Sequence, residues 1–326
     1  MENSAVPKVS VIIPLYNKAP YIKRALDSVF AQTVQDFEVI VVNDGSKDGG
    51  EKIVEEYGDS RIHLINQENQ GVSAARNHGV DAARAELVAF LDADDEWLPN
   101  FLETILELRA KYPHAGLYGT GYKRISTNSD EITCSLNFEE EGGEITYFKE
   151  KLQNPLMIIL TSGMVIPKRI FSDVGGFPVG YPQNEDRCLR AKIALRYSVI
   201  YSPKICLIYY VDATNTIKRF QDGFIKDSFT EYVNENKSKL LIRDDWIDIK
   251  EFCNVATLSV MSGNLKSTYY DKEVRTILKN IDTERYKLER VVYFYSSYLP
   301  KKIRPVMLTL IQHYSTVKHY FFGINP

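Results

Sequence analysis

The chain of 326 residues has little cysteine and no long apolar run. Cys134, Cys188, Cys206 and Cys253 are far apart, with no C-x-x-C pair and no nearby histidine to complete a metal cluster, so we expect free thiols. No stretch approaches the roughly 18 apolar residues of a membrane-spanning helix. The first ten residues lack the charged-then-apolar pattern of a secretory signal. These absences predict a cytoplasmic protein.

The chain also lacks a strong charge of either sign. Its formal net charge is -3, which gives no argument for a nucleic-acid partner, and 44% hydrophobic with 25% charged residues is typical of a globular protein. No acidic side chain follows Glu289, however, whereas residues 291–326 contain four Lys and Arg residues and eight Phe and Tyr residues. Residues 291–326 are therefore predicted either to contact the anionic inner face of the cytoplasmic membrane or to form an ordinary helical subdomain.

Apolar runs alternate with helical patterns in the first part of the chain. The run "VSVIIPLYN" precedes "YIKRALDSVFAQ", whose apolar residues recur at helical spacing, and "FEVIVVNDGS" precedes "GGEKIVEEY". A third unit begins at "RIHLI", and "ELVAFLD" is a fourth strand. This alternation predicts an α/β fold with a mostly parallel central sheet flanked by helices.

Beyond about residue 115 the pattern is less regular. The further strand candidates are "GLYGTGYKRI", "PLMIILTSGMVI" and "SVIYSPKICLIYY", and from about residue 216 the pattern becomes helical. We therefore expect an α/β domain over residues 1–215 and a mainly helical extension over residues 216–326, with a boundary near Thr216.

Polar residues follow the carboxyl ends of three predicted strands, at Asn43 and Asp44, at residues 66–71, and at residues 92–95. Ligands bind at this edge of parallel sheets, so these residues should line one crevice. The last group lies in "FLDADDEW", where a strand period of two places Asp92 and Asp94 on one face. The two carboxylates can share a hard divalent cation with a diphosphate, whereas Asp95 is expected to cap the following helix. A plain solvated turn is the alternative.

Five ordered segments resemble the inverting nucleotide-sugar glycosyltransferases of family 2, which have the GT-A fold. They are "VSVIIPLYNK", "VVNDGSKDGG", "NQGVSAARNHG", "FLDADDEW" and "GGFPVGYPQNEDRCLR", and the resemblance covers roughly residues 8–212. Single segments are weakly specific, but five in this order and spacing are strongly so. The resemblance extends no further toward the end of the chain.

This resemblance implies roles on the donor side of the site. Asp44 would read a uracil or similar base, although "NDGS" alone also suits an ordinary turn, and Asn43 stands where family members often carry Asp. The resemblance places Asp92 near the ribose and metal and Asp94 as the direct ligand of Mn²⁺ or Mg²⁺, as in the family's DXD motif. The other wall of the base pocket would be formed by Pro14, Tyr16 and Asn17.

On the acceptor side, the matching acidic pair is Glu185 and Asp186. The resemblance implies Asp186 as general base and Glu185 as a residue that shapes the acceptor site, although acidic residues in the first turn of a helix also suit its dipole. Arg76 lies one turn into a helix that opens after a glycine, where it can approach the diphosphate or the metal carboxylates; a surface ion pair is the alternative.

The sequence thus predicts a metal-dependent inverting glycosyltransferase. It would move a sugar from a nucleotide-diphosphate sugar, with a UDP-sugar favoured, to a hydroxyl of a glycan or lipid-linked acceptor in surface polysaccharide synthesis. A nucleotidyltransferase and a non-catalytic nucleotide-sugar-binding protein are the alternatives. A nucleotidyltransferase would be expected to open on a Gly-rich basic loop, which the sequence lacks. A non-catalytic binding protein has no need of both the Asp92/Asp94 pair and Asp186.

Overall fold

The computed structural model describes residues 6–126, 130–136, 141–154, 159–181, 184–211, 228–254 and 256. The chain divides into two compact units, residues 1–217 and residues 218–326. All of the predicted site residues belong to the first unit. Thr216 and residues 291–326 lie outside the described residues.

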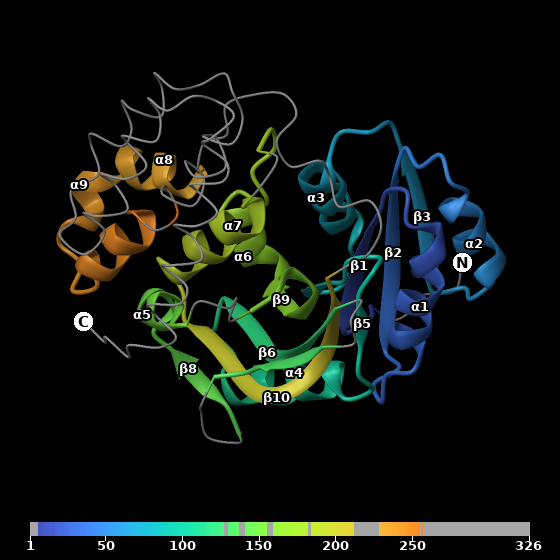
Figure 1. Ribbon diagram of the computed structural model, residues 1–326, viewed down its shortest axis with the longest axis horizontal. Helices are drawn as coiled ribbons and strands as arrows, with labels where there is room; N and C mark the ends of the chain where they lie inside the picture. The colour runs from blue at the N-terminus through green and yellow to red at the C-terminus, as the bar shows by residue number, and fades with distance from the viewer. Residues whose placement is uncertain are drawn as a thin grey trace. The chain divides into compact units, whose positions relative to one another are not determined.

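A single sheet organises the first unit (Figure 1). Its strands run in the order β3-β2-β1-β4-β9-β6-β10-β5, with β7 paired to β6 and β8 to β10. The strands are β1 (Val9–Leu15), β2 (Phe37–Asp44), β3 (Ile62–Gln67), β4 (Leu87–Phe90), β5 (Glu96–Trp97), β6 (Leu117–Ile125), β7 (Glu131–Cys134), β8 (Gly143–Ile145), β9 (Met164–Pro167) and β10 (Val199–Tyr210).

The first four sheet positions are parallel, as are β6 and β10, whereas β9 runs antiparallel between β4 and β6. This arrangement confirms the predicted α/β fold with a mostly parallel central sheet. Of the described strand candidates, "GLYGTGYKRI" and "SVIYSPKICLIYY" form the neighbours β6 and β10. The apolar run before "SGMVI" is only partly described.

Helices cover both faces of the parallel strands. The helices of the first unit are α1 (Ala19–Phe30), α2 (Gly50–Tyr57), α3 (Val72–Ala82), α4 (Phe101–Lys111), α5 (Tyr147–Gln153), α6 (Lys168–Asp173) and α7 (Glu185–Ala194), with a short 3-10 turn, η1 (Thr161–Gly163). On one face, alternate β1 residues from Val9 to Leu15 pack with apolar residues of α1 and α4 in one core.

The opposite face of β1 packs against α3 at a glycine. A Cβ atom at Gly79 would stand 2.5 Å from Ile12 Cγ2, so only a residue without a side chain lets the helix approach this closely. The contact fixes α3 over the sheet. It thereby places Arg76, one turn earlier, at the edge where the strands end.

The second unit is helical where it is described. It contains α8 (Ser228–Glu235) and α9 (Lys237–Leu240), and residues 246–254 are also helical. Phe229 and Phe252 meet edge to face, with ring centroids 5.4 Å apart.

Cysteines 134, 188, 206 and 253 are buried as free thiols. Among the described helices, none is both long and apolar enough to cross a membrane.

Candidate active site

The site lies where β2, β3 and β4 end. Asp44 is the last residue of β2, and Asn66 pairs with Asn43 across the neighbouring strands in register. Asp92 and Asp94 follow the last residue of β4 within four positions. The parallel arrangement therefore brings the three predicted polar groups to one edge of the sheet, as expected from the crevice rule.

The Asp44 carboxylate organises the loop that enters α3. It accepts hydrogen bonds from Gln67 Nε2 and Gln70 N, both at 2.8 Å on Oδ1, and from Gly71 N at 2.9 Å on Oδ2. The residue is buried. Asp44 thus holds the end of β3 and the start of α3 against β2, a structural task that the turn pattern did not reveal.

The segment after β1 provides the facing loop. Pro14 remains in β1 opposite Val42, and the next residue but one, Tyr16, is exposed. Asn17 has a positive φ of 50° and accepts a hydrogen bond from Lys47 N at 2.8 Å. This bond joins the loop after β1 to the turn after β2, so Pro14, Tyr16 and Asn17 lie beside the Asp44 region.

The Asp94 carboxylate is paired with Lys18. Lys18 Nζ lies 2.6 Å from Asp94 Oδ2, and the two side chains are 16% and 20% exposed. Arg24 of α1 donates to the backbone carbonyl of Asp94 and stacks over the ring of Tyr210, with its Cζ 3.7 Å from the ring centroid. Sequence analysis did not single out Lys18, although it directly follows the "PLYN" segment.

Arg76 links the two acidic groups of the site. Its Nη2 lies 2.6 Å from Asp92 Oδ1 and its Nη1 lies 3.0 Å from Glu185 Oε1, while its side chain is 5% exposed. The guanidinium also stands over the ring of Phe177, with its Cζ 5.1 Å from the centroid. Two segments that are more than 90 residues apart in sequence are therefore joined by one buried cation. Arg76 forms this buried link, not the surface pair that was the alternative.

The carboxylate of Asp186 in α7 is held by one residue of the same helix and one of η1. Helix α7 begins at Glu185 with Asn184 as its N-cap, so Glu185 and Asp186 lie in its first turn. Asp186 Oδ2 accepts hydrogen bonds from Arg190 Nη2 at 2.8 Å and from Thr161 Oγ1 at 3.1 Å. Burial alone would raise the pKa of Asp186, but the Arg190 guanidinium and, more weakly, Arg76 hold it well below its usual range.

Glu185 has the opposite electrostatic environment. Burial and the neighbouring charge of Asp186 raise the pKa of Glu185, and the Arg76 pair offsets only part of this shift. Adjacent carboxyl groups thus have pKa values pushed in different directions. Such a separation is typical of groups that perform different tasks in a site.

The prediction for Asp95 is wrong. Helix α4 begins at Phe101 with Asn100 as its N-cap, so Asp95 lies too early to cap it. Asp95 is instead buried, where it accepts hydrogen bonds from Ser162 Oγ and, at 3.3 Å, from Tyr210 N. Burial and the charges of Asp92 and Asp94 raise its pKa well above the usual range. It ties the loop after β4 to η1 and to the end of β10.

Asp92 and Asp94 suit a hard divalent cation by their chemistry. Both present carboxylate oxygens, and both side chains are partly exposed, at 32% and 20%. Among the residues that the structure describes, no group of three or more His, Cys, Asp or Glu side chains is arranged to hold a metal ion. The two carboxylates would therefore need oxygen ligands from a bound diphosphate or water to complete a metal shell.

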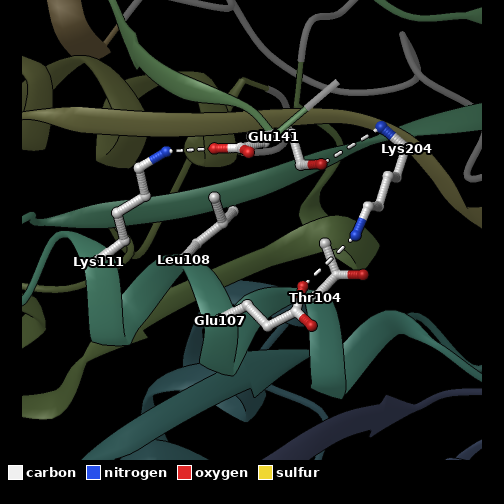
Figure 2. A pocket seen from close by; sticks show the side chains of 7 residues that line it. Thr104, Glu107, Leu108, Lys111, Glu141 and Lys204 are labelled. Carbon is white, nitrogen blue, oxygen red and sulfur yellow. Dashed lines mark hydrogen bonds and ion pairs between the residues drawn. The ribbon is translucent and has the colours of Figure 1, made fainter. Parts of the chain in front are cut away.

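A separate cavity of about 370 Å³ lies between α4 and β10 (Figure 2). Ion pairs cross it from Lys111 to Glu141 at 2.9 Å and from Lys204 to Glu107 at 3.4 Å. None of the predicted site residues lines it. The four charged residues that line the cavity form these two ion pairs with one another. We therefore do not assign the cavity to the candidate active site.

The fold and the aspartates at the ends of the parallel strands define the class of protein. Residues 10–175 match the family model described as glycosyl transferase family 2, and the chain belongs to this family. It is an α/β transferase with the GT-A fold.

Individual relatives agree with this class. An uncharacterized glycosyltransferase of Rickettsia typhi is 34% identical over 224 residues, which are 66% of this chain and 68% of the relative. One of Rickettsia felis is 35% identical over 213 residues, but these are only 34% of that protein's length. The crystal structure of Staphylococcus aureus TarS 1-349 in complex with UDP-GlcNAc has a TM-score of 0.58 at 18% identity and covers 91% of each chain. That likeness concerns the fold.

Proposed function

We propose that the chain is a metal-dependent inverting glycosyltransferase that uses a nucleotide-diphosphate sugar, with UDP-sugars favoured. The observation that carries the proposal is the Arg76 bridge, which joins the Asp92 loop to the acidic start of α7 through contacts of 2.6 and 3.0 Å. Donor-side and acceptor-side carboxylates must stand close together for a sugar to pass between them. Membership of the family and the UDP-GlcNAc complex of TarS support the choice of donor.

On the donor side, Asp44 would accept a hydrogen bond from the base, with Pro14, Tyr16 and Asn17 forming the facing wall. Asp44 already accepts hydrogen bonds from two backbone N–H groups, and these keep its carboxylate in place before a nucleotide arrives. The exposed ring of Tyr16 is available for stacking. The loop would therefore need little rearrangement to bind a nucleotide.

Asp94, with Asp92 beside it, would hold Mn²⁺ or Mg²⁺ against the diphosphate. The bound ion would supply charge neutralisation on the leaving diphosphate. Arg76 keeps Asp92 in position from the protein side, and its buried guanidinium adds a fixed positive charge near the same group. Asp92 thus has one defined orientation toward the crevice.

On the acceptor side, Asp186 would accept the proton of the attacking hydroxyl, which belongs to a glycan or lipid-linked acceptor. Arg190 and Thr161 fix the orientation of its carboxylate, and the Arg190 guanidinium keeps it ionised. Glu185 would shape the acceptor pocket from the other side of Arg76. Attack by the hydroxyl on the face opposite the diphosphate would invert the anomeric carbon.

The proposal is tested by calorimetric binding of UDP, GDP, dTDP and CDP to the full chain, each with and without Mn²⁺. We expect one diphosphate to bind in a metal-dependent manner and the metal dependence to be lost in Asp94→Ala. Asp81 is exposed on α3, so Asp81→Ala is the matched control and should bind the diphosphate as the wild type does. Absence of binding under every condition would refute the metal-diphosphate site and favour a scaffold without catalysis.

A further inference from the structure

The cation that faces Asp94 comes from the loop before α1. Lys18 is the residue that precedes α1, and its ammonium lies 2.6 Å from Asp94 Oδ2. The same ammonium stands 5.7 Å from the centroid of the Tyr21 ring. Both partners of the ion pair are partly buried, at 16% and 20% exposure, so the contact is a defined part of the site.

An ammonium in this place competes with a divalent ion for the same oxygen. Carboxylate ligands approach Mg²⁺ at about 2.0–2.1 Å, and an ammonium cannot donate a hydrogen bond along the same lone pair at the same time. The ammonium and the divalent ion also repel each other, more strongly near a protein surface than in bulk water. A metal bound at Asp94 Oδ2 therefore requires Lys18 to move away, and a metal bound at Oδ1 would place two cations on one carboxylate.

We propose that Lys18 is a tethered counter-cation that holds Asp94 when the site contains no metal and thereby weakens metal binding in the absence of nucleotide. This inference rests on the proposed metal site at Asp94. A diphosphate changes the balance, because its oxygens add ligands to the metal and also offer the displaced ammonium a new anionic partner. Metal and nucleotide should consequently bind cooperatively.

A lysine within α1 provides a control. Lys23 forms an i,i+4 pair with Asp27 at 2.8 Å, but its side chain is 68% exposed. Replacement of either lysine by methionine keeps most of the aliphatic stem and removes one positive charge. The comparison of Lys18→Met with Lys23→Met therefore separates a local effect at Asp94 from a general change in charge.

The experiment is a Mn²⁺ titration of the full chain, with free Mn²⁺ followed by its electron paramagnetic resonance signal, without nucleotide and with UDP. Without UDP, we expect Lys18→Met to bind Mn²⁺ about tenfold more tightly than the wild type, which corresponds to about 1.4 kcal/mol. Lys23→Met should stay within about twofold of the wild type. With UDP present, the advantage of Lys18→Met should shrink. Melting temperatures confirm that each variant is folded.

Asp94→Asn distinguishes the failure of this inference from the failure of the proposed function. If Asp94→Asn loses Mn²⁺ binding while Lys18→Met binds as the wild type does, or more weakly, then Lys18 does not compete and the inference is wrong. If Asp94→Asn binds Mn²⁺ like the wild type, the metal site itself is wrong. Should the wild type bind no Mn²⁺, binding in Lys18→Met alone would support the inference, and its absence there would overturn it.

Discussion

Replacement of Arg76 by methionine should destabilise the first unit in a pH-dependent manner. The wild-type guanidinium compensates Asp92 and Glu185 at 2.6 and 3.0 Å, and its side chain is 5% exposed. Breaking a fully buried ion pair costs about 3–5 kcal/mol. Because Asp92 is 32% exposed and can be partly solvated, we expect a loss of about 2–4 kcal/mol at pH 7.5.

The sign of the pH dependence follows from Glu185. Burial and Asp186 already raise its pKa in the folded chain, and removal of Arg76 takes away an opposing effect, so the pKa should rise further. The folded state then binds a proton more tightly than the unfolded state. The contribution of Glu185 to the free energy of unfolding is therefore fully present below its unfolded pKa of about 4.3. It is lost as the pH rises through the folded pKa of Glu185. The deficit of Arg76→Met should shrink at pH 5.

Urea unfolding at pH 7.5 and pH 5 measures both effects. Trp97 is buried in the first unit and Trp246 belongs to the second, so a Trp246→Phe background makes fluorescence report on the first unit. Arg196→Met is the control, because the Arg196 pair with Asp173 is exposed and should contribute at most about 1 kcal/mol. A loss for Arg76→Met below about 1 kcal/mol would refute the bridge as a stabilising contact, and a larger loss that is equal at both pH values would refute the role of Glu185 in its pH dependence.

Three further predictions concern other parts of the chain. Gly79→Ala should cost about 1–3 kcal/mol in urea unfolding, because the new Cβ would stand 2.5 Å from Ile12 Cγ2; an unchanged midpoint would contradict the close packing. Burial, with Arg190 and Arg187, lowers the pKa of Lys151 to about 8. The unfolded chain therefore binds more protons between about pH 8 and pH 10, and Lys151→Met should be more stable than the wild type at pH 7 by about 1–2 kcal/mol, an advantage that fades by pH 10; a constant difference would be inconsistent with this. Finally, if residues 291–326 contact a membrane, the full chain should float with vesicles that contain phosphatidylserine but not with neutral vesicles, and the reversed charges of a Lys301→Glu and Lys302→Glu variant should abolish flotation.

The parallel half of the sheet could be predicted because its information is local. Buried strands such as β2 read as continuous apolar runs, and the turn that follows contains the Asn, Asp and Gly typical of strand ends. The rule that ligands bind at this edge then placed Asp44, Asp92 and Asp94 together. Glu185 and Asp186 likewise lie in the first turn of α7, where acidic side chains suit the helix dipole.

The remaining features depend on contacts between distant segments. Strand β5 has only two residues and exists because Trp97 pairs with Leu207 of β10, which no local pattern reveals. The burial of Asp95 depends likewise on Ser162 and Tyr210. The Arg190 partner of Asp186 was detectable, since charged residues four positions apart meet on a helix. Lys18 had no such signal, because its carboxylate lies 76 residues away.

Donor turnover is the decisive test of sugar transfer with Asp186 as the base. Nuclear magnetic resonance would follow the hydrolysis of the nucleotide sugar whose diphosphate binds in calorimetry, with Mn²⁺ present and water as the acceptor, for the wild type, Asp186→Asn and Glu185→Gln. We expect Asp186→Asn to bind the nucleotide normally and to lose about 100-fold or more of the turnover, and Glu185→Gln to retain more activity. Wild-type turnover in Asp186→Asn would contradict the role of Asp186 as the base. Loss of turnover in Glu185→Gln alone would assign that role to Glu185.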